Sequence, residues 1–514
     1  MKKFFITTPI YYVNDIPHIG HAYTTVAADA VARYKRLKSG KENVFFLTGA
    51  DEHGQKVEKA ALSAGKTPLA FADGVVVRFK ELWKRLNISN DVFIRTTEER
   101  HKKAVRELWR RVKEKGDIYK GSYEDWYCVP CETFITEKEV PDGKCPACAR
   151  PVEKVKEESY FFKLSGYGDK ILDHIEKNPD FISPQNRKNE ITSFLKEGLR
   201  DLSVSRPRAR LTWGIPVPDD EAHTIYVWFD ALTNYLTGTG YPGENYKDLW
   251  PADVHFIGKD ILRFHAVYWP AFLLSAGLPL PKKIFAHGWW TVEGQKMSKS
   301  VGNVVDPFDV ADKFGVDQFR YFLLREFPFG LDGDFSIHAL KSRINGELAN
   351  AIGNLLSRTV AMVEKYRAGE IPLSVAIEDR DKEKIRQEFV HIFEIHKIFD
   401  NDMNNLKFSE AIELILVLTR ELNAYVDVSA PWTLAKNKDE ATLSNVLYTL
   451  CEGLRIVAVY LYPFMPESAQ KIWEQLGIKK EIESCRFDEE VKWGGQKISG
   501  LKVQKGPSLF PKVE

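Results

Sequence analysis

The chain has 514 residues, of which 44% are hydrophobic and 28% charged, a composition that excludes a disordered protein and is typical of a globular one. This length exceeds what one hydrophobic core organises, so we expect two to four domains. The 73 basic and 72 acidic side chains nearly cancel, so any contact with RNA has to come from local patches. No apolar run approaches the ~20 residues that span a bilayer. We therefore expect a cytoplasmic protein with no membrane partner.

The chain begins with a strand–helix–strand pattern. Residues 3–8 and 43–48 are short apolar runs that favour buried parallel strands, and residues 18–38 have a helical period that stops at a glycine. This order predicts an α/β fold with a doubly wound, Rossmann-like parallel sheet. Its ligand site should lie at the carboxyl ends of the strands, near residues 9–21 and 49–54.

The tetrapeptide His18-Ile19-Gly20-His21 lies where the first predicted strand turns into a helix. Backbone N–H groups at a helix N-terminus attract phosphate, and Gly20 lets the backbone approach a ligand closely. His18 and His21 share one helix face, where both can donate to phosphate oxygens. Two alternatives are a metal-binding pair and two surface histidines, and the tetrapeptide by itself does not exclude them.

Four of the six cysteines fall within one short window, which favours metal binding in a reducing compartment over disulfides. The C-x2-C pairs Cys128/Cys131 and Cys145/Cys148 have the spacing of a structural zinc site. Four thiolates fill a tetrahedral shell, so we expect one structural Zn²⁺ with no open position for substrate. The alternative, four buried thiols, is disfavoured because both pairs lie in turn-like segments.

Further along the chain, apolar runs at 224–229, 254–257 and 283–287 predict that the sheet resumes, and beyond about 345 the pattern is helical. We expect an α-helical bundle to follow the α/β half. The predicted divisions are the first half of the α/β domain at 1–115, a connective insertion at 116–215 with a zinc knuckle at 126–150, the second half at 216–320, a linker at 321–345, a helical domain at 346–480 and a tail at 481–514.

A second short motif, Lys296-Met297-Ser298-Lys299-Ser300, follows the last predicted strand of the α/β half. A mobile loop with two lysines can close over a triphosphate and neutralise its charge, although a solvated basic loop has a similar composition. The two motifs together resemble the signature pair of the class I aminoacyl-tRNA synthetases. The resemblance implies that His18, His21, Lys296 and Lys299 stabilise phosphate charge during attack of an amino-acid carboxylate on ATP, with Mg²⁺ on the phosphates. It also implies that Lys299 acts most strongly in the transition state.

Three further segments, Ala50–Gly54, Trp228–Tyr235 and Gly258–Trp269, make the chain similar to the methionyl-tRNA synthetase family nearly from end to end. The family's positions for ATP match His18, Gly20, His21, Gly258, Asp260 and Lys299. Those that line its methionine pocket match Ile10, Tyr12, Trp228, Ala231, Leu232, Tyr235, Ile261, His265 and Trp269, and its carboxylate for the amino group matches Asp51. Arg206 matches the arginine of a Ser-Arg pair. An aromatic slot suits a linear, polarizable thioether, although such spacing is also typical of ordinary core.

The same resemblance implies contacts with tRNA in the helical half. Asn354, Arg358 and Trp432 match the residues that read the CAU anticodon, although an exposed polar pair and a core tryptophan are the ordinary alternatives. We expect activation of L-methionine by ATP to methionyl-adenylate and pyrophosphate, then transfer to the 3′ end of tRNA(Met), including the initiator. The expected partners are ATP, L-methionine and tRNA(Met), without DNA, and the expected state is a monomer.

Three competing functions fit the sequence less well. A synthetase for an aliphatic amino acid is disfavoured because no large editing insertion is visible and the pocket is aromatic. A cysteine-specific synthetase would need a zinc with an open position facing substrate. A non-catalytic, RNA-binding zinc module is disfavoured by the intact motifs that contain His18, His21, Lys296 and Lys299.

Overall fold

A computed structural model describes residues 3–14, 16–128, 133–135, 140, 143–146, 149–296, 304–373 and 390–514. The chain forms two compact units. The sheet unit comprises Met1–Pro17, Phe45–Lys84 and Asn90–His287, and the helical unit comprises His18–Val44, Arg85–Ser89 and Gly288–Glu514. Among helices of the described residues, none is long and apolar enough to cross a membrane.

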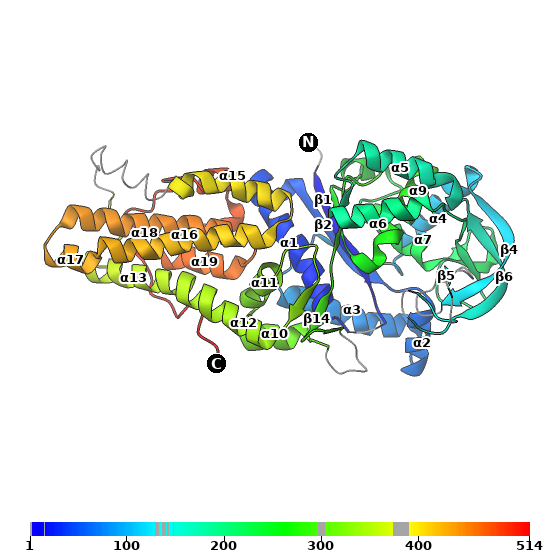
Figure 1. The fold of residues 1–514 in the computed structure, drawn as a ribbon, viewed down its shortest axis with the longest axis horizontal. Coiled ribbons are helices and arrows are strands. Elements are labelled where there is room, and N and C mark those ends of the chain that lie inside the picture. The colour runs from blue at the N-terminus through cyan, green and yellow to red at the C-terminus, as the bar shows by residue number, and fades with distance from the viewer. Residues whose placement is uncertain are drawn as a thin grey trace. The chain divides into compact units, whose positions relative to one another are not determined.

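The centre of the sheet unit is a six-stranded sheet in the order β3-β2-β1-β12-β13-β7 (Figure 1). Its strands are β1 (Phe4–Tyr12), β2 (Val44–Asp51), β3 (Val92–Arg95), β7 (Ile182–Ser183), β12 (Val254–Gly258) and β13 (Ile284–His287). β2 pairs with β3 in parallel, β1 with β12, β12 with β13, and β13 with β7. The prediction of a parallel α/β sheet is confirmed, as are its strands at 3–8, 43–48, 254–257 and 283–287.

The strand order reverses between β1 and β12. From β1 the chain proceeds to β2 and then β3 on one side, whereas β12 continues to β13 on the other. In open α/β sheets, ligands bind outside the carboxyl ends of the strands at such a reversal. Here those ends carry Ile10 and Tyr12 on β1, and Gly258 on β12. The topology therefore identifies the edge of the sheet where a ligand site is expected.

Helices pack against this sheet in one large and one smaller apolar core. The helices of the sheet unit are α2 (Gln55–Ser63), α3 (Pro68–Arg85), α4 (Glu99–Glu114), α5 (Gly168–Lys177), α6 (Gln185–Lys196), α7 (Val227–Leu232), α8 (Asn234–Thr237) and α9 (Trp269–Ser275). Helix α4 presents an apolar face that buries Leu108, Trp109 and Val112, while its charged residues lie on the opposite face. The same core contains Leu47 of β2 and Phe272 of α9.

Two smaller antiparallel sheets belong to the same unit. One has the order β5-β4-β6-β8 and the other β10-β11-β9. Their strands are β4 (Ile118–Cys128), β5 (Thr133–Ile135), β6 (Glu153–Phe162), β8 (Leu202–Ser203), β9 (Ser205–Pro207), β10 (Pro216–Val217) and β11 (Asp220–Ile225). The long pairing of β4 with β6 supports the segment that carries Cys128 at its end.

The prediction for residues 224–229 is wrong. Strand β11 ends at Ile225 and lies in the antiparallel sheet with β9 and β10, while Val227–Leu232 form the short helix α7. Short apolar runs of aromatic and β-branched residues do not distinguish a buried strand from a buried helix. Because Val227, Phe229 and Leu232 are all buried in the core, a short helix accommodates this run.

The helical unit begins with α1 (Ile19–Ser39), which confirms the helix predicted at 18–38. Its other helices are α10 (Pro307–Phe314), α11 (Val316–Arg325), α12 (Ile337–Arg343), α13 (Asn354–Arg367), α15 (Val390–Asn404), α16 (Phe408–Ser429), α17 (Pro431–Lys436), α18 (Glu440–Leu461), α19 (Pro466–Gln475) and α20 (Phe487–Glu490). A small sheet has the order β15-β14-β16, with β14 (Trp290–Val292), β15 (Gln295–Lys296) and β16 (Gly333–Phe335). Helices α13, α16 and α18 lie side by side (Figure 1).

A buried charge cluster joins α1 to α11 within the helical unit. The Asp29 carboxylate accepts hydrogen bonds from Arg33 at 2.8 Å and Arg320 at 2.7 Å, and from the backbone and hydroxyl of Ser89. Burial alone would raise the pKa of Asp29, but the two guanidinium groups lower it below its usual range. A buried charge without such partners would be strongly destabilising.

Candidate active site

The two histidines of the first motif form the cap of helix α1. The Gly20 backbone N–H donates to Nδ1 of His18 at 3.1 Å, and the His18 backbone N–H donates to Nδ1 of His21, also at 3.1 Å. These bonds form a reciprocal capping box, and the two rings lie 3.9 Å apart between centroids. His18 is the N-cap of α1 and not part of the helix, so the two imidazoles lie together at the helix start, where N–H groups of α1 lack partners within the helix.

These hydrogen bonds fix the proton positions of both rings. A nitrogen that accepts from a backbone N–H carries no proton, so neutral His18 and His21 each hold their proton on Nε2. Burial and the neighbouring His18 lower the pKa of His21 well below its ordinary value. The motif can therefore offer two neutral N–H donors beside a positive helix terminus, a combination suited to phosphate oxygens.

The second motif lies at the edge of the described residues. Lys296 ends β15, whereas Met297, Ser298, Lys299 and Ser300 lie outside the described residues. The chain is described again from residue 304, and the carbonyl of Val305 accepts a hydrogen bond from the Ile19 N–H at 3.3 Å. Because Ile19 is the first residue of α1, the segment that follows the Lys-Ser-rich motif contacts the first motif within the helical unit.

The aromatic residues predicted to line the methionine pocket gather in one part of the sheet unit. Tyr235 and Trp269 are buried in the main core, with ring centroids 6.0 Å apart. The predicted residues that pack into the same core are Tyr12, Trp228, Leu232, Tyr235, Ile261 and Trp269. Ile10 lies on β1 in the same strand as Tyr12, and Ala231 is buried on α7 beside Leu232. Several separate elements thus contribute to one apolar region.

His265 occupies the polar position in this region. Its Nδ1–H donates to the carbonyl of Ile261 at 3.0 Å, and its Nε2 accepts from the hydroxyl of Tyr235 at 2.7 Å. Burial lowers the pKa of His265 to about 4, although the Ile261 carbonyl and the Asp260 charge act in the opposite direction. The imidazole is therefore neutral at pH 7, so the region presents no positive charge to an apolar side chain.

Phe264 is a site residue that the sequence reasoning missed. Its ring stacks on Trp228 with centroids 3.7 Å apart and planes within 7°. The predicted four-residue spacing of Ile261, His265 and Trp269 assumed a regular helix, but Phe264–Tyr268 form a π-helical turn before α9. Such turns alter which residues share a face and recur at functional sites. The π-helical turn therefore places Phe264 against Trp228.

The remaining predicted residues of the sheet unit lie at the carboxyl ends of strands. Asp51 is the last residue of β2, is buried, and its carbonyl accepts from the Val13 N–H at 3.1 Å. Gly258 ends β12, and Asp260 follows it in an exposed position. A Cβ atom at Gly258 would lie 2.5 Å from Oδ1 of Asp260, so a larger residue there would require that exposed carboxylate to move. These residues lie at the edge of the sheet identified by its topology.

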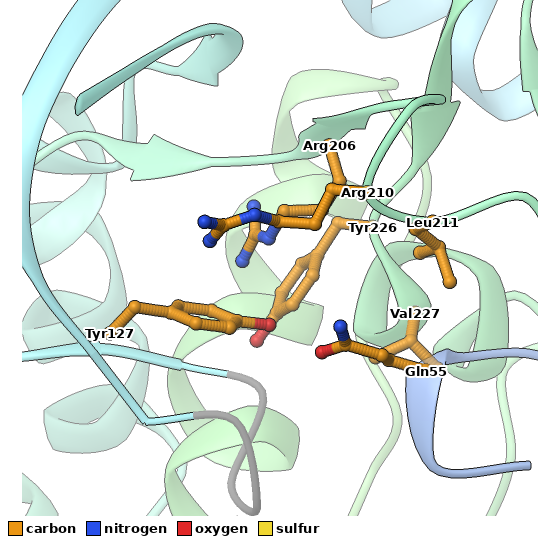
Figure 2. Close-up of a pocket in the computed structure, with 7 residues that line it drawn as sticks. All are labelled: Gln55, Tyr127, Arg206, Arg210, Leu211, Tyr226 and Val227. Atoms are coloured by element: carbon orange, nitrogen blue, oxygen red, sulfur yellow. The ribbon is translucent and has the colours of Figure 1, made fainter. Parts of the chain in front are cut away.

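Arg206 contributes to a separate polar pocket. Its guanidinium lies over the rings of Tyr127 and Tyr226, 5.2 Å and 4.8 Å from their centroids, and donates to the Ser205 carbonyl at 2.6 Å. Figure 2 shows Arg206 and Arg210 together in this pocket, whose lining residues are Gln55, Tyr127, Arg206, Arg210, Leu211, Tyr226 and Val227. Two guanidinium groups beside aromatic faces favour an anionic ligand.

Two of the four predicted zinc ligands lie within the described residues. Cys128 and Cys145 are buried in one small cluster, whereas Cys131 and Cys148 fall outside those residues. Two backbone hydrogen bonds join Cys145 to later residues: its N–H donates to the Arg150 carbonyl at 2.8 Å, and its carbonyl accepts from the Ala149 N–H at 2.7 Å. Within the described residues, no group of three potential ligands could hold a metal.

The predicted anticodon residues lie on two helices of the helical unit. Asn354 begins α13 and is exposed, and Arg358 lies one turn later, where it forms a 2.7 Å ion pair with Asp427. Trp432 on α17 keeps 49% of its surface exposed. The alternative that Trp432 is a core residue is therefore wrong. An exposed tryptophan offers a flat ring for stacking.

Comparisons with known proteins agree with this architecture. The family described as tRNA synthetases class I (M) matches residues 4–154 and 150–360, and the anticodon-binding domain of tRNA ligase matches residues 390–504. The parallel sheet, the capped histidine motif and the helical region thus define a class I aminoacyl-tRNA synthetase.

Individual relatives narrow the assignment. The methionine–tRNA ligase of Caldanaerobacter subterraneus subsp. tengcongensis is 51% identical over all of this chain and 79% of its own length, and that of Rickettsia conorii is 53% identical over the full length of both. The structure of Mycobacterium tuberculosis methionyl-tRNA synthetase in complex with methionyl-adenylate has a TM-score of 0.93, at 45% identity over 99% of this chain and 100% of that one. The chain belongs to the methionine–tRNA ligase family. It activates methionine with ATP and transfers it to tRNA, so the expected enzyme class and function are confirmed.

The low pKa of His265 gives a prediction for stability. Between pH 6.5 and about 4 the unfolded chain takes up a proton at His265 that the folded protein does not. Stability should therefore fall as the pH falls through this window, by up to about 1.4 kcal/mol per pH unit from this group. His265→Gln should make the melting temperature less sensitive to pH between 6.5 and 4.5. His338→Gln, at an exposed histidine, is the control. Equal pH sensitivity of His265→Gln and wild type would contradict the buried, neutral imidazole.

Proposed function

We propose that the methionine side chain binds in the aromatic region of the sheet unit, among Ile10, Tyr12, Trp228, Ala231, Leu232, Tyr235, Ile261, His265 and Trp269. The observation that carries this proposal is that six of these residues, from several elements, pack into one core in which the hydroxyl of Tyr235 donates to the neutral His265. The six are Tyr12, Trp228, Leu232, Tyr235, Ile261 and Trp269. Aromatic edges and faces attract a thioether, and a narrow slot disfavours β-branched side chains. Asp51, at the carboxyl end of β2, supplies the negative charge for the amino group.

We also propose roles for the two motifs in the activation step. The methionine carboxylate attacks the α-phosphate of ATP, the bond to the β-phosphate oxygen breaks, and pyrophosphate leaves. His18 and His21 donate Nε2–H bonds to phosphate oxygens, the Gly20 backbone lies close to the nucleotide, and Gly258 and Asp260 hold the adenosine. Lys296 and Lys299 stabilise the charge that develops on the phosphates, so catalysis consists of positioning and electrostatics. Mg²⁺, bound with ATP, would add neutralisation of phosphate charge.

Lys299 gives the sharpest test of this catalytic proposal. If its charge acts mainly in the transition state, Lys299→Ala should lower kcat of methionine-dependent ATP–pyrophosphate exchange by about 10²–10³-fold with little change in the methionine KM. Lys505→Ala removes an exposed lysine of the helical unit and should leave both constants unchanged. Near-normal turnover of Lys299→Ala with a raised methionine KM would place this lysine in methionine binding instead.

We propose one structural zinc ion, held by Cys128, Cys131, Cys145 and Cys148. Its support is the shared buried cluster of Cys128 and Cys145 and the backbone hydrogen bonds that join Cys145 to Ala149 and Arg150. Zinc would supply a cross-link between these two segments through four thiolates, which leave no position for substrate. Its role is therefore structural.

Metal analysis of the protein, purified under reducing conditions without chelator, should give one zinc per chain. Cys131→Ser should reduce zinc content and make residues 126–150 sensitive to protease, because three thiolates hold the metal less tightly. The control is Cys485→Ser, at a buried cysteine of the helical unit whose hydrogen bond to the Glu481 carbonyl a serine can retain. No zinc in the wild-type protein, or equal zinc in Cys131→Ser, would remove the proposed site.

We propose that Asn354, Arg358 and Trp432 read the anticodon of tRNA(Met), including the initiator. The exposed ring of Trp432 can stack on a base, while Asn354 and Arg358 can donate to base edges. Arg358 would exchange its ion pair with Asp427 for a contact with the base. A cytoplasmic monomer without DNA as a partner is also proposed, since an enzyme that charges tRNA acts where translation takes place.

Trp432→Ala should weaken tRNA binding by about ten- to hundred-fold, because stacking of a base on an aromatic ring is worth roughly 1–3 kcal/mol. The tRNA KM for charging should rise, while exchange without tRNA and the melting temperature stay near wild type. Ile398→Ala on α15 truncates a side chain that is also 49% exposed, and should leave charging unchanged. A large fall in melting temperature, with charging lost in proportion, would instead identify a structural role for Trp432.

A further inference from the structure

A buried carboxylate lies between two histidines in the sheet unit. Oδ2 of Asp230 lies 2.6 Å from Nδ1 of His53, and Oδ1 lies 2.7 Å from Nε2 of His101. All three side chains are buried, and the other ring nitrogen of His101 is 2.9 Å from the hydroxyl of Thr237. An ionised carboxylate only accepts hydrogen bonds, so each histidine must donate one.

This arrangement keeps Asp230 ionised away from water. Burial by itself would raise its pKa, but the electrostatic interaction with His53 and the hydrogen bonds from both imidazoles lower the pKa of Asp230 to about 2. Removal of one partner from a buried charged network leaves a desolvated group without compensation. The three side chains therefore hold one another in a single geometry.

The elements joined by this carboxylate carry different parts of the proposed methionine site. Asp230 lies on α7, between Trp228 and Leu232. His53 follows β2, two residues after Asp51, although it is 177 residues from Asp230 in the chain. The hydrogen bond between Asp230 and His53 thus joins helix α7, which carries Trp228, to the segment that carries Asp51.

Other contacts hold the remainder of the segment after β2. The indole N–H of Trp213 donates to the Glu52 carbonyl at 2.5 Å, and the Gly54 N–H donates to the Trp213 carbonyl at 3.1 Å. The Glu52 carboxylate accepts from Arg95 of β3. These contacts join the segment to β3 and to the chain around Trp213, whereas Asp230 joins it to α7.

We propose that Asp230 is a positioning residue for methionine, which fixes the distance between Trp228 and Asp51 through its hydrogen bonds to His53 and His101. It touches no substrate. The inference rests on the proposed methionine site. Trp228 contacts the methionine side chain in that site, and Asp51 supplies the carboxylate for the amino group. A bound methionine has to satisfy both ends at once, so an error in their separation weakens binding even when each residue remains intact.

The first test is Asp230→Asn, which preserves size and removes the charge. The methionine KM in ATP–pyrophosphate exchange should rise by about ten- to hundred-fold, while the ATP KM stays within about twofold. Asp117→Asn is the matched control, since this carboxylate accepts from the hydroxyls of Tyr167 and Ser275 in the same unit. It should lower stability without raising the methionine KM. An equal rise of the methionine KM in Asp230→Asn and Asp117→Asn would show that Asp230 contributes only to the stability of the fold.

The second test isolates the hydrogen bond and does not depend on the folding of Asp230→Asn. The amide nitrogen of asparagine can replace Nδ1 of a histidine, and that of glutamine can replace Nε2. His53→Asn and His101→Gln should therefore keep a donor to Asp230 and a methionine KM near wild type. His53→Ala and His101→Ala should raise it. The proposal is wrong if the Asn or Gln variant changes the methionine KM as much as the Ala variant at the same histidine. It is also wrong if none of the four variants changes the methionine KM.

Trp228→Ala separates this inference from the proposed methionine site on which it rests. If Trp228→Ala raises the methionine KM but the Asp230 and His53 variants do not, the site stands and the positioning role is wrong. If Trp228→Ala leaves the methionine KM unchanged, the proposed site itself fails. Melting temperatures of all variants, measured with and without methionine, show whether a loss of binding reflects unfolding.

Discussion

The order of the strands reverses between β1 and β12, and the rest of the sheet unit depends on that reversal. Neighbouring parallel strands whose connections lead away in opposite directions leave their carboxyl ends uncovered. Tyr12 and Gly258 lie there because their strands end there, not because either residue prefers a ligand. The short helices and loops that follow the strands then place side chains around this opening. A rigid sheet thus supplies the frame, and irregular segments supply the specificity.

The sequence was most informative where a regular period extends over many residues. The helix at 18–38 and the buried strands at the start of the chain have a single interpretation, because a long amphipathic or apolar pattern fits one element. The run from Thr224 to Phe229 was misassigned because its six residues fit either a strand or a turn of buried helix. Tertiary packing decides such cases, and α7 forms because it buries Phe229 and Leu232 together.

Several site residues could not be predicted because their roles depend on contacts between distant parts of the chain. A lone His53 or Asp230 has no local signature, and their hydrogen bond joins residues 177 apart. Phe264 was missed for a different reason, since the π-helical turn changes the spacing of residues on one face. The exposure of Trp432 also came from the structure, because a tryptophan near a helix end is compatible with core or surface.

The capping box of α1 has a consequence for how this enzyme can evolve. His18 and His21 each need an acceptor at the Nδ1 position to hold the helix start, and the proposed catalytic role needs a donor at Nε2. Asparagine can supply the acceptor without the distant donor, and lysine can supply a donor without the acceptor. A single substitution therefore loses either the helix start or the chemistry. Histidine meets both requirements because its five-membered ring carries the acceptor at Nδ1 and the donor at Nε2, and this restricts substitution at both positions.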